Sequence, residues 1–153
     1  MNRVSPVLLA ILVSTSALAA NVHLKGKSVP TFTDEGTTLS VRTCLAGLGA
    51  GDLTVDIDAS GIGETECSNP GGNVAPGQDT EVDTSGTLLI PSTQFKNGTV
   101  CFTVETDEPT VPDTPTCPND HWSADVIDVD FSDATLLVYQ GGQLVFQFSN
   151  DSL

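Results

Sequence analysis

The chain has 153 residues, of which 20 are acidic and five are Lys or Arg, so its formal net charge is −15, and 39% of its residues are hydrophobic. This is the length of one ordinary domain, and the scarcity of Lys and Arg argues against a nucleic-acid binder or a basic helix on a membrane surface. The hydrophobic fraction and the regular alternation of polar and apolar residues argue against a disordered acidic tail.

Residues 1–19 have the three parts of a secretion signal. A short basic start, Met1-Asn2-Arg3, precedes an apolar run from Val7 to Val13, and Ala17-Leu18-Ala19 is a small-residue cleavage site. A membrane anchor would need roughly 20 apolar residues, more than twice this run. Cleavage there removes one basic residue and leaves four basic and 20 acidic residues, a net charge of −16. We predict that residues 20–153 form a single secreted domain, periplasmic or extracellular, with no membrane span.

From residue 29 onward, alternating polar and apolar residues predict β-strands. Leu39, Val41 and Thr43 alternate with polar neighbours, as the two faces of a half-buried strand require. The last two strands flank Gly141-Gly142, a pair that accepts the positive φ angles of a two-residue hairpin turn. The predicted strands cover residues 38–44, 53–60, 86–90, 99–105, 127–131, 135–140 and 143–149.

The segments between these strands have the composition of turns. Residues 47–51, 69–77, 97–98 and 109–118 are rich in Gly, Pro and Asn. No segment of helical length shows the 3.6-residue spacing of an amphipathic helix. We therefore predict an all-β domain, an immunoglobulin-like two-sheet sandwich of about seven strands, with a small barrel as the alternative.

The four cysteines predict two disulfides. Thiols of exported proteins tend to pair, and the absence of Cys-x-x-Cys spacing argues against a zinc site. Strand alternation places Cys44 and Cys101 on the polar faces of their strands, whereas Cys67 and Cys117 both lie in irregular stretches. This match favours the pairs Cys44–Cys101 and Cys67–Cys117 over the sequential alternative.

Several loop motifs occur together in this chain. The run from Thr65 to Gln78 contains Asn-Pro-Gly-Gly-Asn-Val-Ala-Pro-Gly-Gln, and Cys117-Pro118-Asn119 is followed by Trp122. These motifs resemble a group of uncharacterised secreted bacterial β-sandwich proteins over most of the mature chain. The resemblance implies that the Cys67–Cys117 pair is typical of the group, that Cys44 and Cys101 are an addition of this member, and that no activity is established. Further residues that carry the resemblance are 45–49, 96–98 and 128–132.

The sequence offers few groups for catalysis. His23 and His121 are the only histidines, there is no Gly-x-Ser-x-Gly elbow, and the thiols are expected to be oxidised. Twenty acidic residues offer many carboxylate pairs, but one Trp and one Tyr are a poor supply of platforms for a sugar substrate. We therefore expect a protein that is not an enzyme.

The acidic residues suggest one candidate cofactor, calcium. Asp125, Asp128, Asp130 and Asp133 lie within nine residues, and carboxylate oxygens suit this ion. Alternation places Asp128 and Asp130 on an outer strand face, and the spacing is not that of an EF-hand loop. The alternative is a solvated acidic face that discourages edge-to-edge aggregation.

The two long loops are the predicted contact surface. Recognition is commonly carried by loops on a rigid sheet, and a Cys67–Cys117 bridge would tether residues 69–77 to residues 109–118. We expect a secreted, non-enzymatic protein that binds a protein or surface partner there, although the same loops would also serve as crossovers stapled for stability. The candidate binding residues are Asn69, Asn73, Gln78, Asn119 and Trp122.

A different class of function is a subunit of a pilus-like or other surface filament. Such subunits assemble when an extended terminal segment of one copy adds a strand to the sheet of its neighbour. Residues Val22 to Val29 precede the first predicted strand and offer a donor segment of this kind. The closing hairpin around Gly141-Gly142 argues against this assembly, because its two strands pair within one chain.

Overall fold

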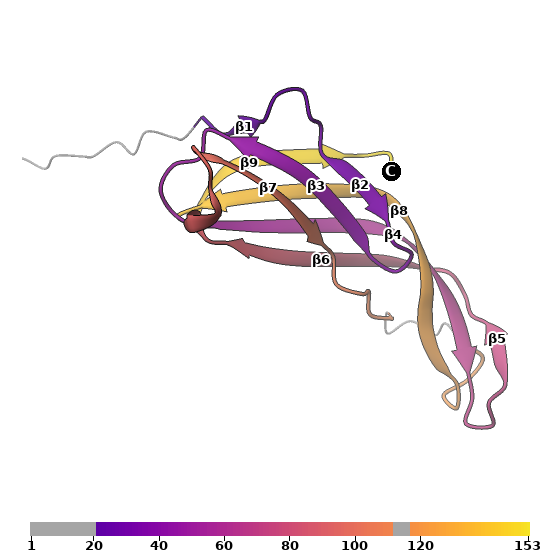
Figure 1. Cartoon of the computed structure of the whole chain (residues 1–153). Coiled ribbons are helices and arrows are strands. Elements are labelled where there is room, and N and C mark those ends of the chain that lie inside the picture. Colours follow the sequence, from indigo (N-terminus) through magenta and orange to yellow (C-terminus); the bar gives the residue numbers. More distant parts are fainter. Residues whose placement is uncertain (1–20, 112–116) are drawn as a thin grey trace, which may run out of the picture.

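The computed structural model describes residues 21–111 and 117–153, which form two antiparallel sheets packed face to face (Figure 1). The predicted secretion signal and residues 112–116 of the predicted Pro-rich loop lie outside the described residues. The strands are β1 (His23–Leu24), β2 (Thr31–Asp34), β3 (Leu39–Ala46), β4 (Leu53–Ser68), β5 (Val74–Pro76), β6 (Thr80–Ile90), β7 (Thr99–Glu105), β8 (Ser123–Gln140) and β9 (Gln143–Asn150), with a 3-10 turn, η1, at Ser92–Gln94.

Each sheet is built around one central strand. In the first sheet, called sheet A, β3 pairs with β7 on one edge and with β1 and then β2 on the other. In the second, called sheet B, β4 lies between β6 and β8, β5 continues the β6 edge, and β9 pairs with β8. The all-β, two-sheet architecture predicted from the alternation is confirmed.

The core lies between the two sheets and follows the predicted alternation. Every second residue of β3 and of the first half of β4 is buried, whereas the residues between them face outward. At one side of the sandwich, the rings of Phe32 and Phe148 stack across the gap between β2 and β9, with centroids 6.2 Å apart. The largest fully buried side chains include Leu39, Val41, Leu45, Leu53, Val55, Ile57, Leu136 and Val138.

At the opposite side, the chain crosses from sheet A to sheet B after β7. The Asp107 amide donates to the Ser85 carbonyl at 2.9 Å, so the segment after β7 runs beside the edge of β6. A Cβ on Gly86 would lie 1.9 Å from the carbonyl oxygen of Glu105. Glycine is therefore required at this crossing because no side chain fits between the two backbones.

The described residues form nine strands, whereas the sequence predicted about seven. Three of the strands, β1, β2 and β5, are too short for alternation to reveal, and β4 and β6 are longer than predicted. The two predicted strands at 127–131 and 135–140 are one continuous strand, β8. Its register against β4 shifts between Ser60 and Gly61 and between Glu64 and Thr65. These bulges reset the alternation, and so the sequence pattern resembled two strands.

The Gly141-Gly142 hairpin between β8 and β9 is confirmed. Gly141 has φ 59° and Gly142 has φ 79°, values that other residues seldom adopt, and the strands pair from Gln140 and Gln143 outward. Of the segment offered as a donor strand, Val22 to Val29, His23 and Leu24 pair with β3 of their own chain. Leu24 lies opposite Leu45 and packs against the core.

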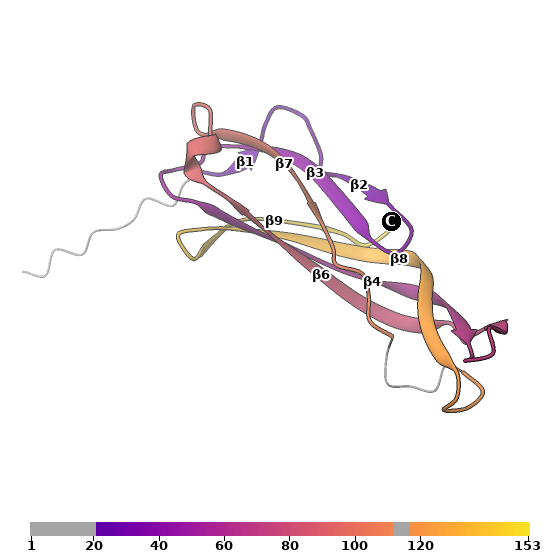
Figure 2. The ribbon, with the colours of Figure 1, turned by 60° about the horizontal axis from the view of Figure 1, so that its bottom comes forward.

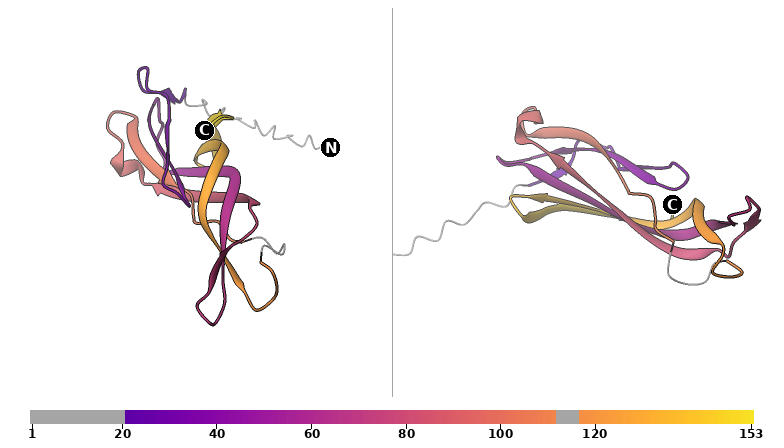
Figure 3. Two further views of the ribbon diagram at one scale, coloured as in Figure 1. Left: turned by 90° about the vertical axis from the view of Figure 1, so that its right-hand side faces the viewer. Right: turned by 90° about the horizontal axis from the view of Figure 1, so that it is seen from below.

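The long strands β4 and β8 continue beyond sheet A as a twisted ribbon (Figures 1 and 2). This projection consists of residues 61–79, which include β5, and residues 117–131, and it is here called the distal arm. The other described residues are called the body. Views from two further directions show that sheet A covers the body and ends near the base of the distal arm (Figure 3). There the Val129 amide donates to the carbonyl of Gly36 in the β2–β3 turn at 3.1 Å.

Candidate functional site

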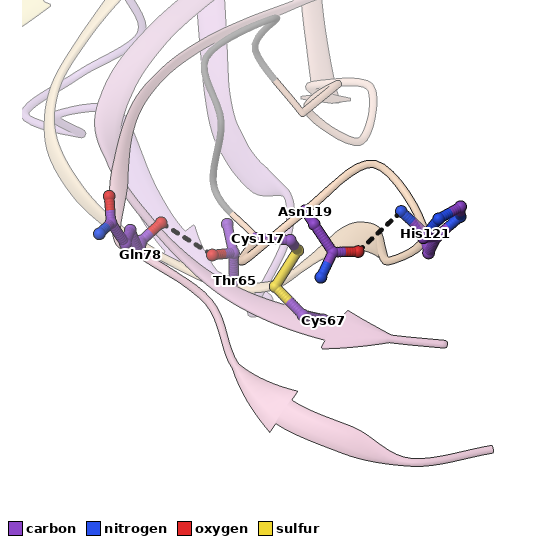
Figure 4. The surroundings of a disulfide bond; sticks show 6 residues. All are labelled: Thr65, Cys67, Gln78, Cys117, Asn119 and His121. Atoms are coloured by element: carbon purple, nitrogen blue, oxygen red, sulfur yellow. Dashed lines mark hydrogen bonds between the residues drawn. A yellow bond between two sulfur atoms is a disulfide. The ribbon is translucent and has the colours of Figure 1, made fainter. Parts of the chain in front are cut away.

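Two loops meet at the end of the distal arm. The β4–β5 turn follows Cys67, which has 0% of its surface exposed, and the segment leading into β8 begins with Cys117. A disulfide joins the two cysteines, whose Cα atoms lie 5.8 Å apart (Figure 4). The end of the arm is therefore a pair of tethered loops on a strand ribbon.

The second disulfide joins the neighbouring strands β3 and β7 in the body. Cys44 and Cys101 are directly opposite in the register, with Cα atoms 4.0 Å apart. Both pairings predicted from strand alternation are confirmed.

The side chain of Asn69 shapes the β4–β5 turn. Its Oδ1 accepts from the amides of Gly71 and Asn73, each at 3.0 Å, and from the Asn73 side-chain amide at 3.3 Å. The backbone closes the same turn, because the Asn69 amide donates to the Asn73 carbonyl. Asn69 is thus occupied in holding the loop, whereas Asn73 is exposed at its end.

The facing loop is organised in a similar way by Asn119. Its Oδ1 accepts from the His121 amide at 3.0 Å (Figure 4), and its carbonyl accepts from the Trp122 amide at 3.1 Å. These bonds form a tight turn that leads into β8. His121 is exposed on this turn, and Trp122 is half-buried.

Gln78 lies where the chain passes from β5 to β6. The Thr65 hydroxyl donates to the backbone carbonyl of Gln78 at 2.8 Å (Figure 4), and the Gly77 amide donates to the carbonyl of Thr65. The backbone of this segment therefore packs against β4, while the Gln78 side chain is exposed. Of the five predicted binding residues, Asn69 and Asn119 have mainly structural contacts, and Trp122 is half-buried. Gln78 presents its side chain to solvent, whereas the side chain of Asn73 is exposed and also bonds to Asn69.

The four aspartates predicted as calcium ligands are spread along β8 on the outer surface of sheet B. Asp125 lies opposite Glu66, Asp128 lies opposite Glu64, and the remaining pair lie opposite Ile62 and Ser60. Within residues 21–111 and 117–153, no group of three or more His, Cys, Asp or Glu side chains is placed to hold a metal ion. The calcium ligand set stays a prediction from the sequence.

Sheet B instead gathers carboxylates from three strands. A surface concavity of about 490 Å³ is lined by Asp58 on β4, Asp83 on β6 and Asp133 on β8, and also by Asp107 and Glu108. The sequence did not reveal this grouping, because only the register places Asp83 and Asp133 on either side of Ser60. Like charges in this arrangement repel one another and attract cations.

The remaining polar contacts lie outside the distal arm. The amide of Ser92 donates to the Asp52 carboxylate at 2.7 Å, and this bond lowers the pKa of that carboxyl group. His23 lies in β1, and its Nδ1 is 2.7 Å from the Asn21 carbonyl. The other histidine, His121, belongs to the distal arm. Since β1 and the distal arm lie at opposite ends of the molecule (Figure 1), the two histidines do not form one site.

Comparison with known proteins found no family model that matches this chain, and no curated protein has a similar sequence. In the part of the chain that the structure describes, no helix has the length and apolar character needed to span a membrane. The two disulfides fit a protein of an extracellular or other oxidising compartment.

Proposed function

We propose that the protein is secreted and binds a protein or surface partner, without catalysing a reaction, through the end of its distal arm. The observation that carries this proposal is the Cys67–Cys117 bridge, which fixes two loops to each other beyond the body of the sandwich. Loops fixed in this way lose little conformational entropy on binding, which favours affinity.

The exposed side chains at the arm match a contact surface of mixed character. Val74 in β5 is 58% exposed and Ile127 in β8 is 47% exposed, and the polar side chains of Asn73 and Gln78 lie on the same arm. Specific interfaces combine such apolar positions with polar groups around them. The loops could instead be crossovers that the disulfide stabilises. That role alone would not require the exposed apolar residues of the arm.

The test is affinity capture from the extracellular fraction of the producing organism, with the mature protein immobilised. The variants Val74→Ser and Asn73→Ala should lose the captured partner, whereas Leu89→Ser, at the other end of sheet B and 70% exposed, should retain it. Retention of the partner by both arm variants, or capture of nothing by the unaltered protein, would contradict the proposal.

A second candidate function is a filament subunit, favoured by the edge of β8. Strand β9 pairs with β8 only over residues 134–140, and the Gly36 carbonyl and the Leu153 amide bond to β8 at Val129 and Ser132. No described strand pairs with the same edge of β8 over residues 123–128. An extended segment of another copy would fit this edge by strand addition. Size-exclusion chromatography of the mature protein tests it, since a monomer at micromolar concentration contradicts self-assembly.

A further inference from the structure

The two disulfides of this protein lie in different surroundings. Cys44 and Cys101 belong to the outer face of sheet A, where Cys101 is exposed and Cys44 is half-buried. In the other disulfide Cys67 has 0% of its surface exposed and Cys117 is half-buried. Of the four cysteines, Cys101 is therefore the most open to a thiol in solution, while Cys67 is covered by protein.

The accessible disulfide also lies in the basic part of an otherwise acidic molecule. The amide of Lys25 donates to the Cys44 carbonyl at 2.8 Å, so Lys25 continues the row formed by Cys44 and Cys101 across sheet A. Lys25, Lys96 and Cys101 together line a surface concavity of about 510 Å³. Arg42 is two residues from Cys44 on the same outward-facing side of β3. The described residues contain four Lys and Arg side chains, and three of them surround this disulfide.

Positive charge beside a disulfide favours its exchange with thiols. The attacking species and the leaving group are both thiolates, and cationic side chains nearby stabilise thiolates. At physiological ionic strength the Debye length is about 8 Å, so the local lysines act more strongly on an incoming thiolate than the distant carboxylates of sheet B do.

We propose that Cys44–Cys101 is a thiol–disulfide exchange site for anionic thiols. The thiolate of the reagent attacks the Cys101 sulfur, the Cys44–Cys101 bond breaks, and its electron pair leaves on Cys44 as a thiolate. The reagent is then joined to Cys101 in a mixed disulfide. Attack by a second thiolate on the reagent sulfur releases the Cys101 thiolate and forms the oxidised, disulfide form of the reagent. Two reagent thiols are thus oxidised for each protein disulfide reduced.

The pairing of β3 and β7 should keep the fold intact after the disulfide is reduced. β3 and β7 are paired over seven residue positions from Ser40 to Ala46, and Cys44 and Cys101 are only one of these pairs. The apolar neighbours of the disulfide, Leu45 and Val100, are buried in the core and hold the two strands in register without it. Exchange at this site therefore changes the outer surface of sheet A and leaves both sheets in place.

The test uses two small thiols of opposite charge, 2-mercaptoethanesulfonate and cysteamine, at equal thiolate concentration and physiological salt. Alkylation followed by peptide mapping measures the reduction of each disulfide. We expect Cys44–Cys101 to be reduced faster than Cys67–Cys117, by on the order of tenfold. A mixed disulfide should form on Cys101, and the far-ultraviolet circular dichroism should not change.

Charge variants separate the role of the lysines from that of exposure. Lys25→Gln combined with Lys96→Gln should lower the rate with the anionic thiol relative to the cationic thiol by about threefold. Lys27→Gln removes the same kind of charge from a residue that does not line the concavity, and should leave the ratio unchanged. Equal reduction of both disulfides, loss of the β-sheet signal on reduction, or an unchanged ratio in the double variant would each overturn the proposal.

Discussion

The body and the distal arm are made from the same two strands, β4 and β8, but different contacts stabilise them. In the body the inner face of β4 carries Leu53, Val55 and Ile57, which are completely buried against sheet A. Farther along, the inner face carries Gly61 and Gly63 and then Thr65 and Cys67. Alternation persists along the whole strand, while the large apolar side chains stop near the point where sheet A ends.

The disulfide and a hydrogen bond take the place of the missing second sheet. Thr65 and Cys67 are as buried as the core residues of the body, at 2% and 0% exposed, although sheet A does not extend over them. They are covered by the returning segments that contain Gly77 and Cys117. Val129 and Phe131 are buried at the base of the arm, but beyond them the arm gains little from apolar burial. We therefore expect the covalent link to contribute most of what keeps the end of the arm ordered.

The largest expected effect is the loss of apolar packing in the body. Ile57→Ala should lower the free energy of unfolding by about 3–4 kcal/mol, because the removed atoms leave a cavity between the sheets. The same substitution on the outer surface of the arm, Ile62→Ala, should cost less than about 1 kcal/mol, since Ile62 is 45% exposed. Chemical denaturation measures both, and equal losses would contradict the distinction between body and arm.

Removal of the arm disulfide should follow in size. Cys67→Ser with Cys117→Ser should lower the free energy of unfolding by about 3 kcal/mol and speed amide exchange in β5 and the adjoining ends of β4 and β8. Cys44→Ser with Cys101→Ser is the matched control, because the sequence separations of the two disulfides are similar, 50 and 57 residues. Faster exchange in the arm of the control variant would show that the arm does not depend on its own disulfide.

A single substitution should have opposite signs in the two regions. Thr43 in the body is 3% exposed and its hydroxyl has no hydrogen-bond partner, so Thr43→Val should raise the free energy of unfolding by about 1 kcal/mol. Thr65 in the arm is equally buried but donates to the Gln78 carbonyl. Thr65→Val should lower the same quantity by about 1 kcal/mol. Thermal unfolding of the two variants side by side provides the measurement.

The smallest expected effect concerns charge on the arm. Glu64 lies directly opposite Asp128, and facing like charges on a sheet destabilise it. Glu64→Gln should therefore raise the free energy of unfolding by a few tenths of a kcal/mol, and added salt should reduce the gain. Asp151→Asn removes one charge from an exposed position outside the strands and should change little. A gain that is independent of salt would exclude repulsion as its cause.

Strand alternation predicted the parts of the fold in which each residue faces either solvent or the core. The strands β3 and β7, the hairpin at Gly141-Gly142 and the choice of disulfide partners all follow from that two-residue period. The prediction failed at β8, where two bulges reset the period, and at β5, where three residues between turns carry no pattern. Neither feature is visible before the partner strand is known, because a bulge is a mismatch between two strands.

The candidate sites were predictable only as sets of residues near one another in the chain. The tethering of the two loops by Cys67–Cys117 was anticipated, but the occupation of Asn69 and Asn119 by loop hydrogen bonds was not. The basic surroundings of Cys44–Cys101 were also missed. Lys25 and Lys96 are distant from each other in the sequence, and only the pairing of β1 and β7 with β3 places them beside the disulfide.

The sequence by itself determined the fold class and the disulfide pairs. Whether a strand residue faces the core or the solvent is a local property, and the alternation of polar and apolar residues reveals it. The tertiary structure decided where sheet A ends, and therefore which part of β4 and β8 is body and which is arm. It also decided which charges lie together. Both depend on strand register across sheets, a long-range property that no single stretch of sequence contains.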